Sequence, residues 1–432
     1  MSLRWLPSLL LPVLLLGCET LRSGAQPEQP LWVNRPSHSI EVVYRTSLVA
    51  PIRRFGEPYE RGEAEIDEQG KRLFVGSSDR GLYCLDAVDG SVLWRFETAG
   101  IVQSAPLFDP AHDVVYFGSG DGALYKLDAR NGQLRYRFAT NAEVAERPVL
   151  VGNTLYFVNS NDTVLAIDAN SGKMRWSQHR TPAMGMEIAG YSGLLYWRGK
   201  VYVGFSDGNV AAYNAKTGEE DWQPVDLAAE AEQSLGSVPQ YFDVDTTPVA
   251  CSLKAGPTIL VASVAGGVFA LDADTGTQNW SNPAVVGTSQ LLLWKQPAHP
   301  DRQGGPPLPE RQLVIAATGT TGLWALDPET GAEKWRTRLP AGAVAGPVPA
   351  DGALLVSASQ LGVFLLSPLD GRVIDGLHAT DGISSLVGVR GNRAFILTND
   401  GELLGLHLSS PLDLRDDNHV SLLGRGYQRG HW

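Results

Sequence analysis

Short runs of β-branched and aromatic residues, broken by polar turns, recur along most of the chain. The stretch "VVYFGSGDGALYKLDARNGQLRYRF" alternates apolar and polar positions and contains Asp-Gly and Asn-Gly pairs, which favour tight hairpin turns. Within such a unit, no run of ten or more residues keeps the apolar spacing of a helix. The pattern therefore predicts short antiparallel strands joined by hairpins.

One set of landmarks returns on a base period of about 40 residues. A turn of the Leu-Asp-Ala type is followed by Gly four residues after the Asp, and by an aromatic residue four residues later, as in "LDAVDGSVLW". Self-similarity at such a period indicates a repeat architecture in which each unit is one small sheet. The marker position is occupied in eight units by Asp86, Asp128, Asp168, Asn214, Asp272, Asp327, Ser367 and His407.

The repeats predict an all-β fold, an eight-bladed β-propeller of four-stranded antiparallel blades. A sheet of this size cannot bury both of its faces, so the copies must pack against one another around an axis. We expect the aromatic residue of each unit to dock on the neighbouring blade. The Gly provides a positive φ, and the marker Asp can accept hydrogen bonds from amides of its own turn. We therefore interpret the repeated Asp as structural rather than catalytic.

The two ends of the repeat region complement each other. After the eighth hairpin, "GELLGLHLSS" continues into a polar tail without a fourth strand, whereas residues 39–48 match the fourth strand of the first unit, with Tyr44 in the aromatic position. We expect Ile40 to Thr46 to pair with Leu403 to Leu408, because such closure removes exposed strand edges. The seventh unit departs from the pattern, with Asp375 in the aromatic position.

The first residues predict export and lipidation. "MSLRWLPSLLLPVLLLGCET" has one basic residue and then an apolar run of eleven residues, which is too short to span a bilayer and typical of a cleaved signal. Leu-Leu-Gly-Cys resembles a bacterial lipobox, which implies acylation of Cys18; a plain signal peptide with a chance Cys is the alternative. We expect a signal peptide at 1–17, a lipidated tether at 18–38, the propeller at 39–408 and an extension of unknown role at 409–432.

Composition narrows the possible partners and chemistry. The formal net charge of −12 argues against nucleic acid and against an anionic membrane surface as direct partners. The eight His residues are scattered without the spacing of metal ligands, so no metal site is expected. Cys84 stands at a position that holds Ala in other repeats, which indicates a small buried side chain. Cys251 lies four repeats away, and distant blades rarely bring two Cα atoms within the roughly 7 Å that a disulfide needs, so we predict two free thiols.

The repeat resembles the tryptophan-docking motif of pyrroloquinoline quinone dehydrogenases, most clearly in "ALDADTGTQNW" and "ALDPETGAEKW". Those enzymes are eight-bladed propellers, so the resemblance leaves a quinone-dependent dehydrogenase as one alternative function. They also carry an adjacent Cys-Cys pair, Ca²⁺ ligands and a catalytic Asp in a longer chain, and no Cys-Cys pair is present here. A sugar- or polymer-binding lipoprotein is a further alternative.

A second resemblance is more specific. "DVDTTPV" at residues 243–249 stands where the innermost strand of the fifth blade should begin. Together with the lipobox, the docking repeats and the closing strand, it resembles the BamB family of the outer-membrane β-barrel assembly machinery, over about residues 1 to 408. The resemblance implies a non-enzymatic scaffold at the periplasmic face of the outer membrane, without a cofactor apart from the lipid on Cys18. Its implied partners are the POTRA region of the barrel-inserting subunit and unfolded outer-membrane proteins.

The same resemblance implies a partner-binding surface. In the family, the Asp-Val-Asp-Thr-Thr-Pro motif and the loop before the fourth blade hold the POTRA region. The loop here reads "MEIAGYS" where the family tends to show Leu-Arg-Gly-x-Ser, so the basic contact is missing. A solvated acidic turn that caps a strand is the alternative interpretation of the two Asp residues. By match, the candidate partner-binding residues are Asp243, Asp245, Thr246, Met186, Ile188, Gly190 and Ser192.

Strand alternation groups these candidates on one face. In a four-stranded blade, the segment before the innermost strand shares a face with the turn between strands two and three, and the turns that carry the repeated Gly lie on the other face. We therefore expect residues 184–193, 223–242 and 243–245 to share a rim, with a short helix at 226–235. Residues 297–311 should form a loop on the opposite face.

Overall fold

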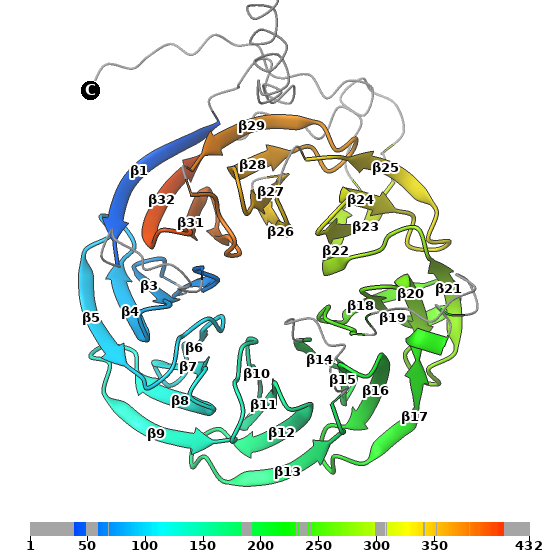
Figure 1. Ribbon diagram of the computed structural model, residues 1–432, viewed down its shortest axis with the longest axis horizontal. Coiled ribbons are helices and arrows are strands. Elements are labelled where there is room, and N and C mark those ends of the chain that lie inside the picture. The colour runs from blue at the N-terminus through cyan, green and yellow to red at the C-terminus, as the bar shows by residue number, and fades with distance from the viewer. Residues whose placement is uncertain are drawn as a thin grey trace, which may run out of the picture.

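The computed structural model describes residues 39–48, 59–67, 69–182, 192–229, 232, 241, 243–298, 307, 309–339, 342–350, 352–379 and 381–409. These residues form eight four-stranded antiparallel sheets, arranged around an axis as the blades of a closed propeller (Figure 1). The eight-bladed all-β fold predicted from the repeats is confirmed.

Each of the first seven blades uses four consecutive strands, in order from the axis to the circumference. Blade one consists of β2 (Ala64–Ile66), β3 (Arg72–Gly76), β4 (Gly81–Asp86) and β5 (Val92–Glu97), and blade two of β6 (Leu107–Asp109), β7 (Val114–Ser119), β8 (Ala123–Asp128) and β9 (Leu134–Ala139). Blade three consists of β10 (Val149–Val151), β11 (Thr154–Asn159), β12 (Thr163–Asp168) and β13 (Met174–His179), and blade four of β14 (Leu194–Trp197), β15 (Lys200–Gly204), β16 (Asn209–Asn214) and β17 (Glu220–Asp226).

The eighth blade differs because its outermost strand comes from the other end of the chain. Blade five consists of β18 (Val249–Leu253), β19 (Gly256–Ser263), β20 (Gly267–Asp272) and β21 (Gln278–Asn282), and blade six of β22 (Thr288–Gln296), β23 (Arg311–Thr318), β24 (Gly322–Leu326) and β25 (Glu333–Thr337). Blade seven consists of β26 (Val344–Ala350), β27 (Ala353–Ala358), β28 (Gly362–Leu366) and β29 (Val373–His378). Blade eight consists of β30 (Gly388–Arg390), β31 (Arg393–Leu397), β32 (Glu402–Leu408) and β1 (Ile40–Ser47).

The marker residue closes its own turn in each of the first six repeats. Asp86 Oδ1 accepts a hydrogen bond from the Val88 amide at 2.7 Å, and the Gly90 amide donates to the Asp86 carbonyl at 2.8 Å. Gly90 has a φ of +74°, which a residue with a side chain rarely adopts. The structural role predicted for the marker is confirmed. The same side-chain contact with the amide two residues later is made by Asp128, Asp168, Asn214, Asp272 and Asp327.

The aromatic residue of each of the first six units docks on the next blade, as predicted. The Trp94 indole nitrogen donates to the Ala129 carbonyl at 3.1 Å, and a Cβ at Gly132 would lie 2.7 Å from the Trp94 ring. The repeated Gly is therefore needed both for its positive φ and for the missing side chain beneath the ring. Matching indole contacts at 2.9 to 3.3 Å join Trp176, Trp222, Trp280 and Trp335 to the carbonyls of Ala215, Ala273, Pro328 and Pro368.

The second blade ends in Tyr136 instead of Trp, and a buried lysine compensates. The Tyr136 hydroxyl donates to the Ala169 carbonyl at 3.2 Å, and Lys126 Nζ donates to the same oxygen at 2.8 Å. Lys126 is only 6% exposed, and its ammonium lies 5.6 Å from the centroid of the Tyr136 ring. An aromatic face stabilises a cation held against it. The smaller aromatic residue therefore still links blade two to blade three.

The hydrophobic core lies between the blades. Among the described residues, eight clusters of buried apolar side chains fill the interfaces, and each cluster combines two neighbouring sheets. At the first interface, Phe74 and Leu82 share a cluster with Phe117 and Tyr125. Each sheet is therefore stabilised by its neighbours, as expected for units too small to fold alone.

The N-terminal strand closes the ring, which confirms the expected pairing. β1 is antiparallel to β32, with Ile40 opposite Leu408. The Tyr44 hydroxyl donates to the Ala87 carbonyl at 3.4 Å, so Tyr44 docks on blade one in the manner of the Trp residues. Figure 1 shows β1 at the circumference between β29 and β5.

Asp375 fills the aromatic position of the seventh repeat for a reason that lies at the N-terminus. Blade eight has no turn between its third and fourth strands, because β32 and β1 are distant in sequence. An aromatic residue would therefore find no Gly turn to cover. Instead, the amides of Ser39 and Ile40 donate to Asp375 Oδ2 at 2.5 and 3.1 Å, and Asp375 is 3% exposed. The carboxylate fixes the start of the closing strand.

The two faces of the disc carry different parts of the chain. Because consecutive strands are antiparallel, turns such as residues 86–90 lie on one face, termed the turn face. The segments before the innermost strands, such as 192–193 and 243–248, lie on the other, termed the lead-in face. β1 starts and β32 ends on the turn face, where the Ser409 amide donates to the Ser39 carbonyl at 2.9 Å.

Candidate functional site

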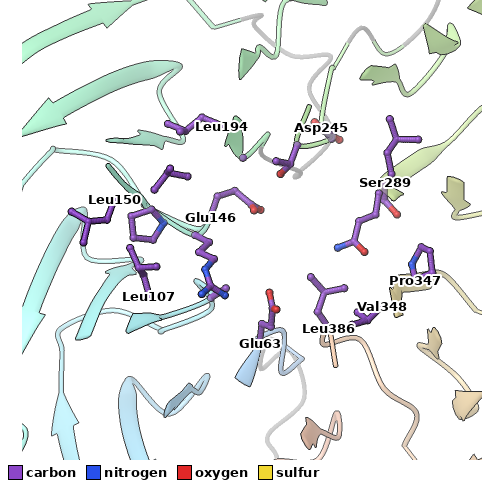
Figure 2. Close-up of a pocket in the computed structure, with 18 residues that line it drawn as sticks. Glu63, Leu107, Glu146, Leu150, Leu194, Asp245, Ser289, Pro347, Val348 and Leu386 are labelled. Atoms are coloured by element: carbon purple, nitrogen blue, oxygen red, sulfur yellow. The ribbon is translucent and has the colours of Figure 1, made fainter. Parts of the chain in front are cut away.

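A cavity of about 540 Å³ lies on the propeller axis and is lined by residues of all eight blades. Figure 2 shows Glu63 and Glu146 directed into it from blades one and three, with Asp245 of blade five at its edge. A smaller cavity of about 190 Å³ adjoins it and shares Glu63 and Glu146. Arg147 is the one cation among the described residues that line the larger cavity, and it is paired with Glu65 at 2.8 Å. The axis is therefore acidic.

Burial raises the pKa of all three axial carboxyl groups. The pKa of Glu146 rises to about 8, mainly because of burial and further because of the charges of Glu63 and Asp245. Burial raises the pKa of Glu63 to about 7, although Arg147 opposes the rise. Burial and then the charge of Asp243 raise the pKa of Asp245 to about 7. These groups consequently titrate near neutral pH, where ordinary carboxyl groups are fully ionised.

Asp243 and Thr246 are both 0% exposed. The Ala262 amide donates to Thr246 Oγ1 at 2.8 Å, and the Val264 amide donates to the Asp243 carbonyl at 3.0 Å. The interpretation of Asp243 as part of a solvated turn is therefore wrong. The Thr246 hydroxyl and the Asp243 backbone shape the segment before β18. Asp245 is less deeply buried, and Thr247 is exposed on the lead-in face.

Ser192 and Thr246, predicted to belong to one surface, are brought together from blades four and five. Ser192 Oγ donates to the Thr246 carbonyl at 3.0 Å and accepts from the Gly204 amide at 3.2 Å. In blade two, Ser104 Oγ likewise accepts from the Gly118 amide at 2.7 Å. The hydroxyl thus recurs as a link between the lead-in segment and the second strand of its blade.

Several other predicted positions lie outside the described residues. These are Cys18, Met186, Ile188 and Gly190. Of the helix expected at 226–235, residues 227–229 are helical, and Asp226 Oδ1 accepts the amides of Ala228 and Ala229 at 2.9 and 3.0 Å. In the part of the chain that the structure describes, no helix has the length and apolar character needed to cross a bilayer.

Sequence reasoning missed Glu63 and Glu146. Like Asp245, each lies within four residues before the innermost strand of its blade. Glu63, Glu146 and Asp245 stand one, three and four residues before that strand in blades one, three and five, so no alignment of the repeats brings them into one position. Alignment on the marker Asp does not match Glu63, Glu146 and Asp245 to one another, because the markers are separated by 40 to 58 residues and the lead-in segments differ in length.

The donor set does not fit a quinone cofactor bound through Ca²⁺. Cys84 and Cys251 are buried free thiols, as predicted, and lie in blades one and five. In the described ranges, no three His, Cys, Asp or Glu side chains are grouped to hold a metal ion, so the axial carboxylates do not form such a group. The neighbouring thiols and Ca²⁺ ligands expected of a quinone dehydrogenase are therefore not assembled by these residues.

Comparison with known proteins identifies the family. The family described as outer membrane protein assembly factor BamB matches residues 60–116, 111–292 and 288–411. The chain belongs to the BamB family. BamB of Burkholderia pseudomallei is 23% identical over 397 residues, which cover 90% of this chain and 93% of that protein. The crystal structure of BamB from Moraxella catarrhalis shares the fold, with a TM-score of 0.65 and 17% identity over 85% of this chain and 100% of that one.

Quinoprotein dehydrogenases share part of the same repeat. Quinohemoprotein alcohol dehydrogenase ADH-IIG of Pseudomonas putida is 28% identical over 221 residues, which cover 45% of this chain and 29% of the enzyme. BamB of Legionella pneumophila is 26% identical over 210 residues, or 48% of each chain. This chain therefore spans less than a third of that enzyme and about half of the Legionella protein.

Proposed function

We propose that this BamB-family chain is a lipid-anchored, non-enzymatic scaffold of the outer-membrane β-barrel assembly machinery. It binds the POTRA region of the barrel-inserting subunit and helps unfolded outer-membrane proteins fold and insert. The observation that carries the proposal is the similarity to a BamB protein over 90% of this chain and 93% of that protein. The poor fit of the axial donor set to a quinone and Ca²⁺ supports a role without redox chemistry.

The two faces of the disc support a division of roles. The expected lipid on Cys18 lies about 20 residues before Ser39, and a flexible tether of that length extends about 25 Å. Because β1 starts on the turn face, the tether joins the propeller there. The lead-in face, with Asp245 and Thr247, is then directed away from the lipid and toward a periplasmic partner.

A rigid disc of this kind acts by holding and orienting its partner. The segments before blades four and five are tied together by Ser192 and Thr246, so the surface around Asp245 and Thr247 is fixed in shape. A preformed surface loses little conformational entropy when it binds. Binding then aligns the barrel-inserting subunit without a covalent step.

Co-purification from crosslinked envelopes tests the proposal. The Asp245→Lys and Thr247→Arg variants should each reduce recovery of the barrel-inserting subunit by about tenfold, equivalent to about 1.4 kcal/mol of binding free energy. The matched control is Glu333→Lys, an exposed charge reversal on the turn face, which should not alter recovery. Asp243 is unsuitable for this test because charge reversal at a buried residue alters folding. If the wild-type chain recovers no assembly subunit, the scaffold proposal fails.

A quinone-dependent dehydrogenase is the second candidate, because part of the repeat is 28% identical to ADH-IIG. Pyrroloquinoline quinone and Ca²⁺ can be added to the purified protein with an alcohol and an acceptor dye. We expect no dye reduction above the level without protein. Sustained turnover would refute the non-enzymatic role.

A further inference from the structure

The exposed apolar side chains of the propeller are unevenly distributed. Among the described residues, eight large hydrophobic side chains are exposed, and six of them lie on the outer strands or a turn of blades eight, one, two and three. Their exposed fractions range from 48 to 66%. These six residues, termed the apolar arc, are Val43, Val88, Val92, Leu93, Leu134 and Met174.

The matching positions in blades four, five and six are polar. Val92, Leu134 and Met174 are the first residues of the outer strands β5, β9 and β13. The first residues of β17, β21 and β25 are Glu220, Gln278 and Glu333. Figure 1 shows β1, β5, β9 and β13 as neighbours along one half of the circumference. Since outer strands start beside the Gly turns, the arc borders the turn face.

Charge follows the same division in blades two and three but not in blade one, where residues 86–93 have a net charge of −2. In residues 128–135, Arg130 and Arg135 outweigh Asp128, and in residues 168–175, Lys173 and Arg175 outweigh Asp168, so each stretch has a net charge of +1. The equivalent stretches of blades four, five and six each have a net charge of −2, as counted over residues 214–221, 272–279 and 327–334. Blades two and three therefore combine exposed apolar groups with a net positive charge, whereas blades four, five and six are polar and net negative here.

A groove of about 460 Å³ lies at the other end of the arc, where blade eight meets blade one. It is lined by Val42, Val43, Ala87 and Val88, with the charged side chains of Arg393 and Glu41 beside them. Blade eight contributes positive charge here through Arg393, next to the turn of blade one, where residues 86–93 have a net charge of −2. Apolar walls next to a guanidinium group suit an acyl chain with its phosphate headgroup.

The start of the propeller lies at this groove. β1 begins at Ile40, three residues before Val43 of the arc, and the preceding tether carries the expected lipid on Cys18. A tether of about 25 Å keeps the turn face within reach of the bilayer that holds the lipid. The net charge of −12 does not prevent contact, because charges more than about 8 Å away are largely screened at physiological salt.

We propose that the apolar arc and the adjoining groove rest on the phospholipid surface that holds the anchor, with Arg and Lys side chains at the headgroups. This inference depends on the proposed lipid anchoring, and it is independent of the proposed partner. The contact fixes the tilt of the disc, so that the lead-in face is turned away from the membrane. Apolar groups inserted among headgroups and basic groups beside anionic lipids are the two sources of such adhesion.

Site-specific fluorescence on the full lipidated chain tests the contact. A polarity-sensitive thiol dye is placed at Met174→Cys and, as a matched control, at Gln278→Cys, the corresponding position of the opposite half. Cys84 and Cys251 are buried, so the dye reacts with the introduced thiol. In vesicles of phosphatidylethanolamine and phosphatidylglycerol, we expect emission from position 174 to shift to shorter wavelength and to be quenched by brominated lipid. Position 278 should show neither effect, and equal behaviour at both positions overturns the proposal.

Vesicle flotation of the unlipidated Cys18→Ser chain separates the surface from the anchor. We expect weak binding that falls at least about tenfold with a Leu134→Glu, Met174→Glu double substitution, equivalent to a loss of about 1.4 kcal/mol. The Gln278→Glu control should leave binding unchanged. If the double variant retains vesicle binding but loses a protein partner, the arc is a protein-binding surface and the proposal is wrong. If co-purification of the barrel-inserting subunit fails while lipid quenching persists, the scaffold proposal falls and the membrane contact stands.

Discussion

Replacement of Asp375 by Ala removes the acceptor for both amides at the start of β1. In the native structure, Asp375 Oδ2 accepts from Ser39 and Ile40, and Asp375 Oδ1 accepts from the Gly376 amide at 2.9 Å. An Ala side chain fits within β29, but it provides no acceptor for the amides of Ser39 and Ile40. The first effect should be separation of β1 from blade eight, followed by exposure of the interface between blades eight and one.

The expected loss follows from the number and type of these hydrogen bonds. A hydrogen bond to a charged group contributes about 1.5 to 3 kcal/mol, so two of them predict a loss of about 3 to 6 kcal/mol in the free energy of unfolding. Asp375→Asn keeps an oxygen acceptor without the charge and should lose about half as much. Asp375→Trp restores the repeat consensus, yet it should destabilise at least as strongly as Ala, because blade eight has no Gly turn for the ring to cover.

Urea unfolding and hydrogen exchange measure the two parts of this prediction. The urea midpoint reports the loss of stability, and exchange of the β1 amides reports local opening. The matched control is Asp370→Ala in the same blade, where an exposed Asp accepts from the Arg372 amide at 3.1 Å, and it should cost less than about 1 kcal/mol. If Asp375→Ala unfolds at the midpoint of the control and its β1 amides exchange at the native rate, the carboxylate does not fix the closing strand.

Three further predictions concern the docking glycines, the axial carboxyl groups and the thiols. Gly331→Ala places a Cβ 2.4 Å from the docked Trp ring and should lower the melting temperature far more than Gly391→Ala, where no atom lies within 4 Å; equal losses would contradict the docking argument. The raised pKa of Glu146, about 8, means that the folded state binds its proton more tightly, so stability is lost as pH rises from about 4.3 toward 8. Glu146→Gln should therefore melt higher than wild type at pH 8, with a smaller gain at pH 5, and a gain independent of pH would refute this cause. Burial raises the pKa of Cys84 and Cys251 to about 12, so brief alkylation at pH 8 should modify neither until the protein is denatured, as judged by mass spectrometry.

Local rules in the sequence predicted the contacts that recur in the first six blades. The Asp86 turn and the positive φ of Gly90 depend on residues within one hairpin, so a single repeat contains their full explanation. Docking of Trp94 on the next blade could be inferred as well, because the aromatic residue and the Gly beneath it recur together. Closure by residues 39–48 was visible because the eighth unit lacks a strand that the N-terminus supplies.

The axial site could not be predicted in the same way. Glu63, Glu146 and Asp245 come from blades one, three and five, and only the circular arrangement brings them around one cavity. Asp375 was visible as an exception, but its partner amides lie 335 and 336 residues away. In the sequence, Asp243 and Asp245 look like equivalent acidic residues. Packing of the segment before β18 buries Asp243 and leaves Asp245 at the axial cavity.

The pairing of β1 with β32 has a consequence for the order of events during folding. Ile40 is among the first propeller residues made, and its partner Leu408 is among the last. Seven blades can stack in succession, but β1 has no partner strand until the final hairpin has formed. Joining segments so far apart along the chain slows folding. A truncated chain that stops before β32 would leave β1 unpaired. The ring therefore closes only after the C-terminal hairpin has formed.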